Sequence, residues 1–526
     1  MNRRNQWLAA PLGAVTAAAL LSGCGSDDSG TGASGSTVVM GMSDKVTATD
    51  PAAGYDAGSW LVFNNVFQTL LSFPKGDTAP EPDAAEECSF EGNGSKVFRC
   101  TLKSGLKFSN GNDLTSKDVK YSFERTLRIN DENGPAVLLS SIESIETPDD
   151  KNVVFRLKTS DATFPSKIAA GAGSIVDHRE YPADKLRTDG KAVGSGVYTL
   201  ESLDDKSARF AVNGSYKGTA KPQNSGMTMK FFRNDQAALK QALDKGEIDF
   251  AFRGLAAQDI ADLGSGTADS PIDVVQGTGA EVQHLVFNMD DPVAGKVEVR
   301  KAVAYLIDRE ALVQNVYAGT ASPLYSIIPS GITGHTTPFF DRYGGTPQPD
   351  KAKQVLRKAG ITDKVALTLW STPSRFGPGT DAELKAIAQQ LNASGLFRAD
   401  VKSVEFEQYE KDMEAGKYGV YVRGWVPDYP DPDNFTQPFF GKDNVLANRY
   451  DNATVSGTIL PRTAAASDRT TTNADYARIQ DIVADEVPIL PLWQGKQYAV
   501  ARENVTGLQW SLDASTVFRF WEISKG

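Results

Sequence analysis

Apolar and polar positions follow one another along the chain in the patterns typical of strands and of helices. Residues 37–42 form a short apolar run that predicts a strand. Residues 55–71 carry apolar side chains at helical spacing, among them Val62, Val66 and Phe67. Further strands are predicted at 153–157, 284–289, 365–370 and 418–422, and further helices around 115–123, 235–245, 299–306, 308–319, 350–360 and 381–394.

Polar residues mark where several of these helices begin. Thr115, followed three residues later by Asp118, is typical of a helix N-cap with an early acidic residue that favours the helix dipole. Val119 and Phe123 then lie on the predicted buried face. Asp235 is expected to cap another helix. These features have an architectural reason, so we assign none of them to ligand binding.

The first residues are typical of an export signal. Arg3 and Arg4 precede a largely apolar stretch, residues 7–21, which is too short for a settled membrane span. Leu-Ser-Gly then leads to Cys24, an arrangement that resembles the bacterial lipobox, in which the cysteine is lipidated and becomes the first mature residue. The alternative is an ordinary signal peptide with a chance cysteine. Residues 25–36 have the composition of a flexible tether.

The other two cysteines, Cys88 and Cys100, flank two short runs around a Gly-Asn-Gly turn. A hairpin would bring the two sulfurs within bonding reach. An exported protein lies in an oxidising compartment, and closing a loop of this size contributes roughly 3 kcal/mol. We favour a disulfide over a metal site because no histidine is nearby in the sequence.

Length and charge narrow the class of protein. The chain has 526 residues, which suggests roughly two to four domains. Its formal net charge of −11 argues against binding to nucleic acid or to an acidic membrane surface, since both need a basic face. The acidity is spread along the chain, so it names no partner.

A proline-rich acidic segment, residues 423–435, follows the strand predicted at 418–422. Its prolines exclude a helix interior or a central strand. We therefore expect the strand to stop at Gly424 and a stiff loop to carry Trp425 and Asp428 out from its end, where ligand-contacting groups are often placed. The alternative is a surface turn with a half-buried tryptophan.

The motif Gly-Trp-x-x-Asp-Tyr-x-Asp-Pro at 424–432 resembles the signature loop of the large solute-binding proteins of oligopeptide and dipeptide ABC transporters, family 5. Other stretches resemble the same family in the expected order, from about Val38 to Phe520. They are the segment 98–123, the Gly-x-Gly-x-Tyr turn at 194–198, the Gly-Glu-Ile-Asp stretch at 246–249, the helix pair at 300–310 and the Val-Thr-Gly turn at 505–507.

The resemblance implies an α/β, two-lobed fold like that of type II periplasmic binding proteins, with the extra subdomain of the large peptide-binding class and two hinge strands. The expected organisation is a lipoprotein signal peptide (1–23), a tether (24–36), lobe I (37–280 and 488–526, with the subdomain around 75–190) and lobe II (281–487).

The resemblance also implies a ligand site. In peptide-binding members, the aspartate three residues after the signature tryptophan pairs with the ligand's α-amine, and here that residue is Asp428. Trp425 and Tyr429 would supply apolar walls. Arg375 falls close to an arginine that contacts the ligand carboxylate in dipeptide-binding relatives; the alternative is a solvated loop arginine. Arg423 is shifted by one residue from the family's arginine and therefore points to the other face.

The implied role is that of a substrate-binding lipoprotein on the extracytoplasmic face of the cell membrane, which is anchored through Cys24. It would capture peptides by hinge closure and deliver them to a membrane permease and its ATPase. A monomer without cofactor is expected. Two alternatives keep the fold: a non-peptide ligand (nickel chelate, glutathione, opine or sugar), or a lipoprotein that senses a ligand for a signalling partner.

An enzyme is the remaining class to weigh. Ser104 and Lys107 have the Ser-x-x-Lys spacing of penicillin-recognising enzymes, but neither of the accompanying motifs follows. The histidines, His178, His284 and His335, are far apart in the sequence and lack metal-ligand spacing. We expect no catalytic residue and no metal.

Overall fold

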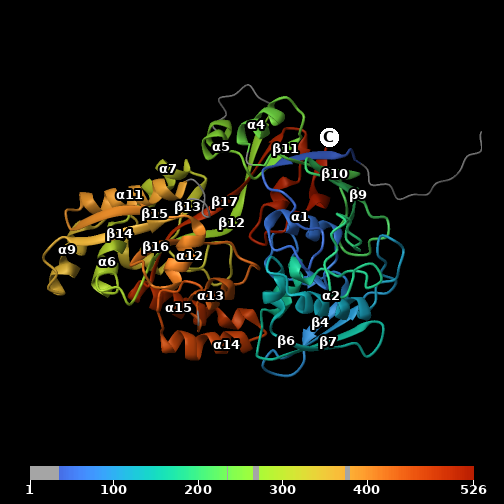
Figure 1. Cartoon of the computed structure of the whole chain (residues 1–526), viewed down its shortest axis with the longest axis horizontal. Helices are drawn as coiled ribbons and strands as arrows, with labels where there is room; N and C mark the ends of the chain where they lie inside the picture. The colour runs from blue at the N-terminus through green and yellow to red at the C-terminus, as the bar shows by residue number, and fades with distance from the viewer. Residues whose placement is uncertain (1–34, 234, 265–271, 373–378, 443) are drawn as a thin grey trace, which may run out of the picture. The chain divides into compact units, whose positions relative to one another are not determined.

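A computed structural model describes residues 35–526 except 234, 265–271, 373–378 and 443 (Figure 1). The predicted signal peptide and the predicted lipidation site at Cys24 therefore lie outside the described residues. Within the described part of the chain, no helix is long and apolar enough to cross a membrane.

Two long strands run through the middle of a mixed sheet, β12 (Ile272–Phe287) and β17 (Ile489–Arg502). They pair antiparallel over most of their length. In Figure 1 they connect a group of short strands on each side. One group is β11 (Phe250–Phe252), β1 (Val38–Met42), β10 (Gly226–Phe231), β9 (Ser207–Val212) and β8 (Tyr198–Leu203); the other is β16 (Val420–Trp425), β14 (Val365–Ser371), β15 (Phe397–Ser403) and, beside β17, β13 (Ala321–Pro323).

Strand β12 begins earlier than the sequence pattern indicated. We predicted a strand at 284–289, whereas pairing starts at Ile272. The stretch Gly-Thr-Gly-Ala at 277–280 interrupts the apolar pattern and conceals the first half of the strand. Glycine is needed there because a Cβ at Gly277 would lie 1.9 Å from the Leu512 carbonyl oxygen, and one at Gly279 would lie 2.4 Å from that of Gly495.

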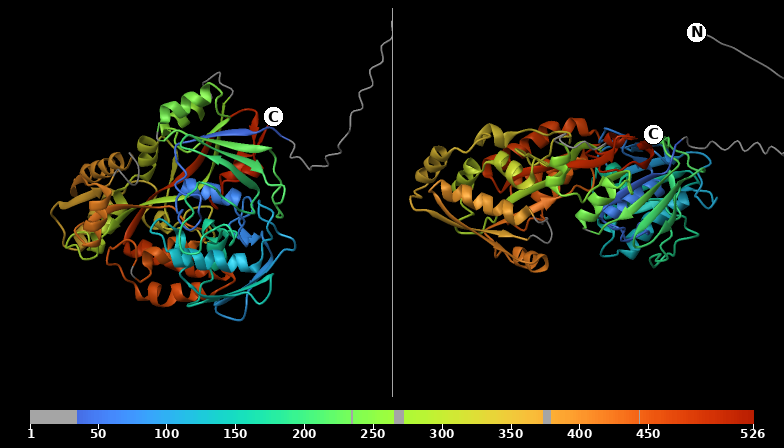
Figure 2. Two further views of the ribbon diagram at one scale, coloured as in Figure 1. Left: turned by 45° about the vertical axis from the view of Figure 1, so that its right-hand side comes forward. Right: turned by 90° about the horizontal axis from the view of Figure 1, so that it is seen from above.

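A separate antiparallel sheet has the strand order β4 (Ala85–Phe90), β5 (Val97–Leu102), β7 (Asn152–Leu157), β6 (Ile142–Glu146). Helix α2 (Ser116–Ile129) lies along it (Figures 1 and 2). Cys88 and Cys100 face each other across β4 and β5 and form a disulfide. The predicted hairpin and disulfide are thus confirmed.

The predicted helix starts at Thr115 and Asp235 are also confirmed. Thr115 and Asp118 form a reciprocal capping box at the start of α2, and the Asp118 carboxylate accepts from the Thr115 backbone N–H at 2.9 Å. Asp235 caps α4 (Gln236–Asp244) through the backbone N–H of Ala238 at 2.9 Å. Local signals therefore define these ends.

The buried apolar side chains form separate clusters. One surrounds β12, β14, β16 and the helices packed on them, another fills the sheet β4–β7 with α2, and a third lies around β1, β8–β11 and the C-terminal residues. Strand β12 contributes Leu285 to the first cluster, and β17 contributes Leu490 to the first and Ala499 to the third. The exact lobe boundaries stay a prediction.

Candidate functional site

The signature loop follows β16, but the strand is longer than predicted. We expected it to stop at Gly424, whereas it continues to Trp425, which pairs with Val282 of β12. Pairing with a central strand holds the tryptophan backbone in the sheet. A single 3-10 turn, Pro432–Phe435, closes the loop. Pro432 is tolerated at the first position of this turn because the backbone N–H of that position has no partner within a helix.

Asn434 organises the loop from inside. Its side-chain oxygen accepts from the Trp425 indole N–H at 2.9 Å and from the Asp428 backbone N–H at 3.1 Å. Its amide nitrogen donates to Asp428 Oδ2 at 3.3 Å. These bonds connect two of the predicted ligand-contacting residues, Trp425 and Asp428, through one polar side chain.

A partly buried ion pair anchors the far end of the loop. Asp431 accepts from Arg469 at 2.6 and 2.9 Å and also accepts from the backbone N–H of Asp433 at 2.8 Å. Burial raises the pKa of the Asp433 carboxyl to about 6, and the neighbouring Asp431 charge adds to this rise. The loop is therefore rigid for structural reasons that do not involve Asp428.

The Asp428 carboxylate is partly buried, and its described partners are neutral. The hydroxyl of Tyr55, directly before helix α1 (Ala57–Val66), donates to Oδ1, and Asn434 donates to Oδ2. Burial raises the pKa of Asp428, whereas these two hydrogen bonds and the charge of Lys167 oppose the rise. Lys167 itself pairs with Asp161 at 2.8 Å.

Tyr429 and Trp425, the predicted walls, have different surroundings. Tyr429 is buried and packs in the cluster of the β4–β7 sheet, with the Lys167 ammonium 5.7 Å from its ring centre. Trp425 is half-buried, and its ring packs edge-on against Phe439 with the centres 5.2 Å apart. Their contact with a ligand stays a prediction.

Arg375 and Arg423 are the two arginines considered for contact with the ligand carboxylate, and the structure describes only Arg423. Arg375 lies in 373–378, outside the described residues, so its predicted role stays a prediction. Arg423 forms an ion pair with Glu410, and its Nη1 lies 3.8 Å from the sulfur of Met413. The Arg423 charge is therefore paired with a carboxylate of the protein itself.

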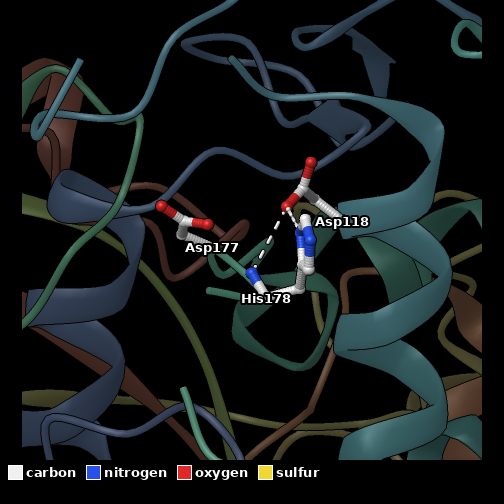
Figure 3. A group of neighbouring side chains, drawn as sticks. All are labelled: Asp118, Asp177 and His178. Carbon is white, nitrogen blue, oxygen red and sulfur yellow. Dashed lines mark hydrogen bonds and ion pairs between the residues drawn. The ribbon is translucent and has the colours of Figure 1, made fainter. Parts of the chain in front are cut away.

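A group of potential metal ligands lies elsewhere, at the start of α2 (Figure 3). His178 Nδ1 lies 2.6 Å from Asp118 Oδ1, and Asp177 lies beside them. Asp177 accepts from Arg179 Nε at 2.6 Å and from two asparagine side chains, which together hold its pKa low although burial opposes this. Arg179 thus supplies a positive charge beside these carboxylates.

A partly open cavity of about 210 Å³ is lined in part by residues of the β2–β3 hairpin (Leu71–Ser72 and Glu81–Pro82) and of the C-terminal segment. Asp83, Tyr216 and Arg519 lie in its wall, and Asp428 does not. Burial raises the pKa of Asp83 to about 6. This cavity is thus separate from the signature loop.

Comparison with known proteins identifies the family. Residues 79–446 match the model of bacterial extracellular solute-binding proteins, family 5 (middle region). The chain belongs to this family. The family 5 "Probable D,D-dipeptide-binding periplasmic protein" of Escherichia coli K12 is 26% identical over 502 residues, covering 93% of this chain and 94% of the relative.

Solved structures confirm the expected α/β, two-lobed fold of family 5. HbpA2 from Haemophilus parasuis superposes with a TM-score of 0.82 at 22% identity, over 93% of this chain and all of the other. NikZ from Campylobacter jejuni, solved with Ni(L-His), superposes with a TM-score of 0.72 at 18% identity, over 93% of this chain and 99% of the other. The relatives are substrate-binding proteins, as expected, and not enzymes.

Sequence reasoning found the family 5 signature loop but missed the partners of Asp428. Tyr55 lies 373 positions away, and no spacing rule connects the two. Asn434 lies six positions from Asp428, beyond the two-residue span of an Asx turn, so no local turn rule indicated its bonds. His178 and Asp118 meet across 60 residues for the same long-range reason.

Proposed function

We propose that this family 5 protein captures peptides between its two lobes by hinge closure and presents them to a membrane permease and ATPase of an ABC importer. Asp428 would bind the free α-amine of the peptide. Trp425 and Tyr429 would border the ligand, and Arg375 would contact its carboxylate. The curated relative above, named for dipeptide binding, supports a peptide as the leading ligand class.

The observation that carries this proposal is a partly buried carboxylate whose described partners are neutral. Asp50 shows the contrast: it is fully buried, and Arg125 donates to both of its oxygens at 2.8 and 2.6 Å. Among the described residues, the Asp428 carboxylate instead accepts hydrogen bonds from two neutral groups, those of Tyr55 and Asn434. A charge of this kind is stabilised when a cation binds, and a primary ammonium fits its remaining lone pairs.

The position of Asp428 also suits closure. Tyr55 comes from the predicted lobe I, whereas Asp428 and Asn434 come from the predicted lobe II. Another contact between residues of the two predicted lobes is the hydrogen bond from the Ala162 N–H to the Ala464 carbonyl oxygen at 2.8 Å. A ligand that binds Asp428 between such segments has contacts that depend on their approach, so it favours the closed state.

The export signal and Cys24 support the location that we propose, a lipid anchor on the extracytoplasmic face of the cell membrane. Metabolic labelling with a palmitate analogue tests this directly. Label is expected on the wild-type protein and should be absent from Cys24→Ala.

A thermal-shift screen tests the ligand class. The purified protein is mixed with di-, tri- and longer peptides, glutathione, sugars and nickel chelates. A ligand at about a hundred times its Kd adds roughly 2.7 kcal/mol to the free energy of unfolding. We expect stabilisation by peptides that disappears when the peptide amine is acetylated, and in Asp428→Ala. The matched control Asp205→Ala removes an exposed carboxylate that pairs with Arg233 and should bind normally.

A non-peptide ligand is the second candidate, because the related NikZ structure holds a nickel–histidine complex. Stabilisation by a chelate, glutathione, an opine or a sugar, with every peptide silent, would keep the transport role and discard the role of Asp428. A sensing role would instead be indicated by a signalling kinase, rather than the permease, recovered with the bound protein.

A further inference from the structure

Tyr55 contacts Asp428, the residue that we propose to bind the peptide α-amine; we call these two residues the amine site. It lies in the turn before α1, its side chain is 38% exposed, and its hydroxyl donates to Asp428 Oδ1. Its ring packs at a tilt against that of Trp60, with the centres 5.5 Å apart. A tyrosine thus reaches from one predicted lobe to the carboxylate of the other.

The backbone around Tyr55 is held on both sides. The Trp60 indole N–H donates to the Gly54 carbonyl at 3.0 Å, and Asp56 caps α1 through the Ser59 backbone N–H at 2.9 Å. The Trp60 ring lies against Gly171, where a Cβ would approach it to 2.9 Å. The hydroxyl of Tyr55 is therefore presented by a rigid support, as a ligand site requires.

Among the described residues, Lys167 is the one charged group that acts on Asp428, and the Tyr55 hydroxyl itself is neutral. Lys167 acts at longer range and is paired with Asp161. Asp433 lies deeper in the same loop, next to the pair formed by Asp431 and Arg469. Burial raises the pKa of Asp428, and the Tyr55 hydrogen bond is the largest influence that opposes this rise.

We propose that Tyr55 is a positioning residue of the amine site: its hydroxyl orients the Asp428 carboxylate and keeps it charged for a primary ammonium group. This inference rests on the proposed function, because the ammonium is that of the captured peptide. The bonds from Tyr55 to Oδ1 and from Asn434 to Oδ2 leave the remaining lone pairs of the carboxylate for the N–H groups of the ligand.

The pH profile of binding tests this role. Alanyl-alanine and trialanine are titrated calorimetrically from pH 4.5 to 7.5, where the peptide α-amine stays largely protonated. For Tyr55→Phe we expect affinity within about threefold of wild type at pH 7.5 and about tenfold weaker at pH 5, because the acidic limb moves to higher pH. Tyr498→Phe is the matched control. The two described hydrogen bonds of the Tyr498 hydroxyl are both long, at 3.4 Å, and neither goes to Asp428.

The variant Asp428→Asn separates the two proposals. It should bind weakly at every pH, and if it binds like wild type, or if wild type binds neither peptide, the proposed function fails together with this inference. If Asp428→Asn loses binding while Tyr55→Phe keeps the wild-type profile, only the role of Tyr55 is overturned. A Tyr55→Phe affinity lowered equally at all pH values also overturns it, since that result indicates a contact without influence on the charge.

Discussion

Asp428 and Glu383 are two carboxylates with similar neighbours and different surroundings. Glu383, in α11 (Gly379–Ala393), accepts from the Trp493 indole at 2.8 Å and from the Tyr317 hydroxyl. Asp428 accepts from the Tyr55 hydroxyl, and a tryptophan indole reaches it through Asn434. The same types of side chain therefore occur at both carboxylates.

Glu383 and Asp428 differ in their burial and in where the residues that donate to them lie. Glu383 is fully buried, and Tyr317 and Trp493 both pack in or against one hydrophobic cluster. Burial raises the pKa of Glu383 to about 7, against hydrogen bonds that oppose the rise. Asp428 instead accepts from Tyr55, an exposed residue 373 positions away in the sequence. The enclosed carboxylate of Glu383 therefore belongs to a core, whereas the partly buried carboxylate of Asp428 is the one that we propose for a ligand.

Removal of the enclosed carboxylate should give the largest effect. Glu383→Ala leaves a cavity and two buried donors, on Tyr317 and Trp493, without an acceptor. We expect the free energy of unfolding to fall by about 3–5 kcal/mol. Urea denaturation at pH 6 measures it. A loss below about 1 kcal/mol would show that water replaces the carboxylate, and Glu383 would then resemble Asp428.

The titration of Glu383 sharpens the contrast further. Its pKa is raised from 4.5 to about 7, so the folded protein binds the proton more tightly than the unfolded chain. Its contribution to stability is therefore fully present below pH 4.5 and is lost as the pH rises through 7, by about 3 kcal/mol in all. Glu383→Gln should lack this loss. If the free energies of unfolding of wild type and Glu383→Gln change in parallel between pH 4.5 and 8, the prediction is contradicted.

His284 allows a test at the base of the signature loop. It is fully buried, neither ring nitrogen has a described partner, and its ring packs edge-on against Phe439, which also contacts Trp425. His284→Leu should stabilise the protein by about 1–2 kcal/mol at pH 7.5 and leave peptide affinity unchanged. Differential scanning calorimetry measures the change in stability, and a calorimetric peptide titration measures the affinity.

The pH dependence of His284 has the opposite sign to that of Glu383. Burial lowers its pKa from 6.5 to about 3, so the unfolded chain binds the proton more tightly. Stability is present above pH 6.5 and falls as the pH drops toward 3. The stabilisation by His284→Leu should therefore increase below pH 6.5. If it decreases instead, the imidazole has found a partner and is charged in the folded protein.

The parts of this structure that sequence could predict are local. The capping box at Thr115, the cap at Asp235 and the hairpin that joins Cys88 to Cys100 depend on residues close together in the chain. The Asp428 loop was found through a motif of this kind. The contact of Tyr55 with Asp428 and that of Tyr317 with Glu383 depend on tertiary packing, which leaves no spacing in the sequence.

The smallest expected effect is the change in stability of Asp428→Asn without ligand. The amide is isosteric and its oxygen can still accept from Tyr55, but its NH2 group cannot accept the long bond from Asn434. Removal of a partly buried charge offsets these losses. We expect a change within about 0.5 kcal/mol at pH 7.5 by urea denaturation, whereas affinity for a peptide amine should fall about 10- to 100-fold, the equivalent of about 1.5–3 kcal/mol. A loss of stability above about 2 kcal/mol would place Asp428 with Glu383 as a structural carboxylate. A small change with lost binding would instead mean that the protein keeps this charge for a partner that it does not itself contain.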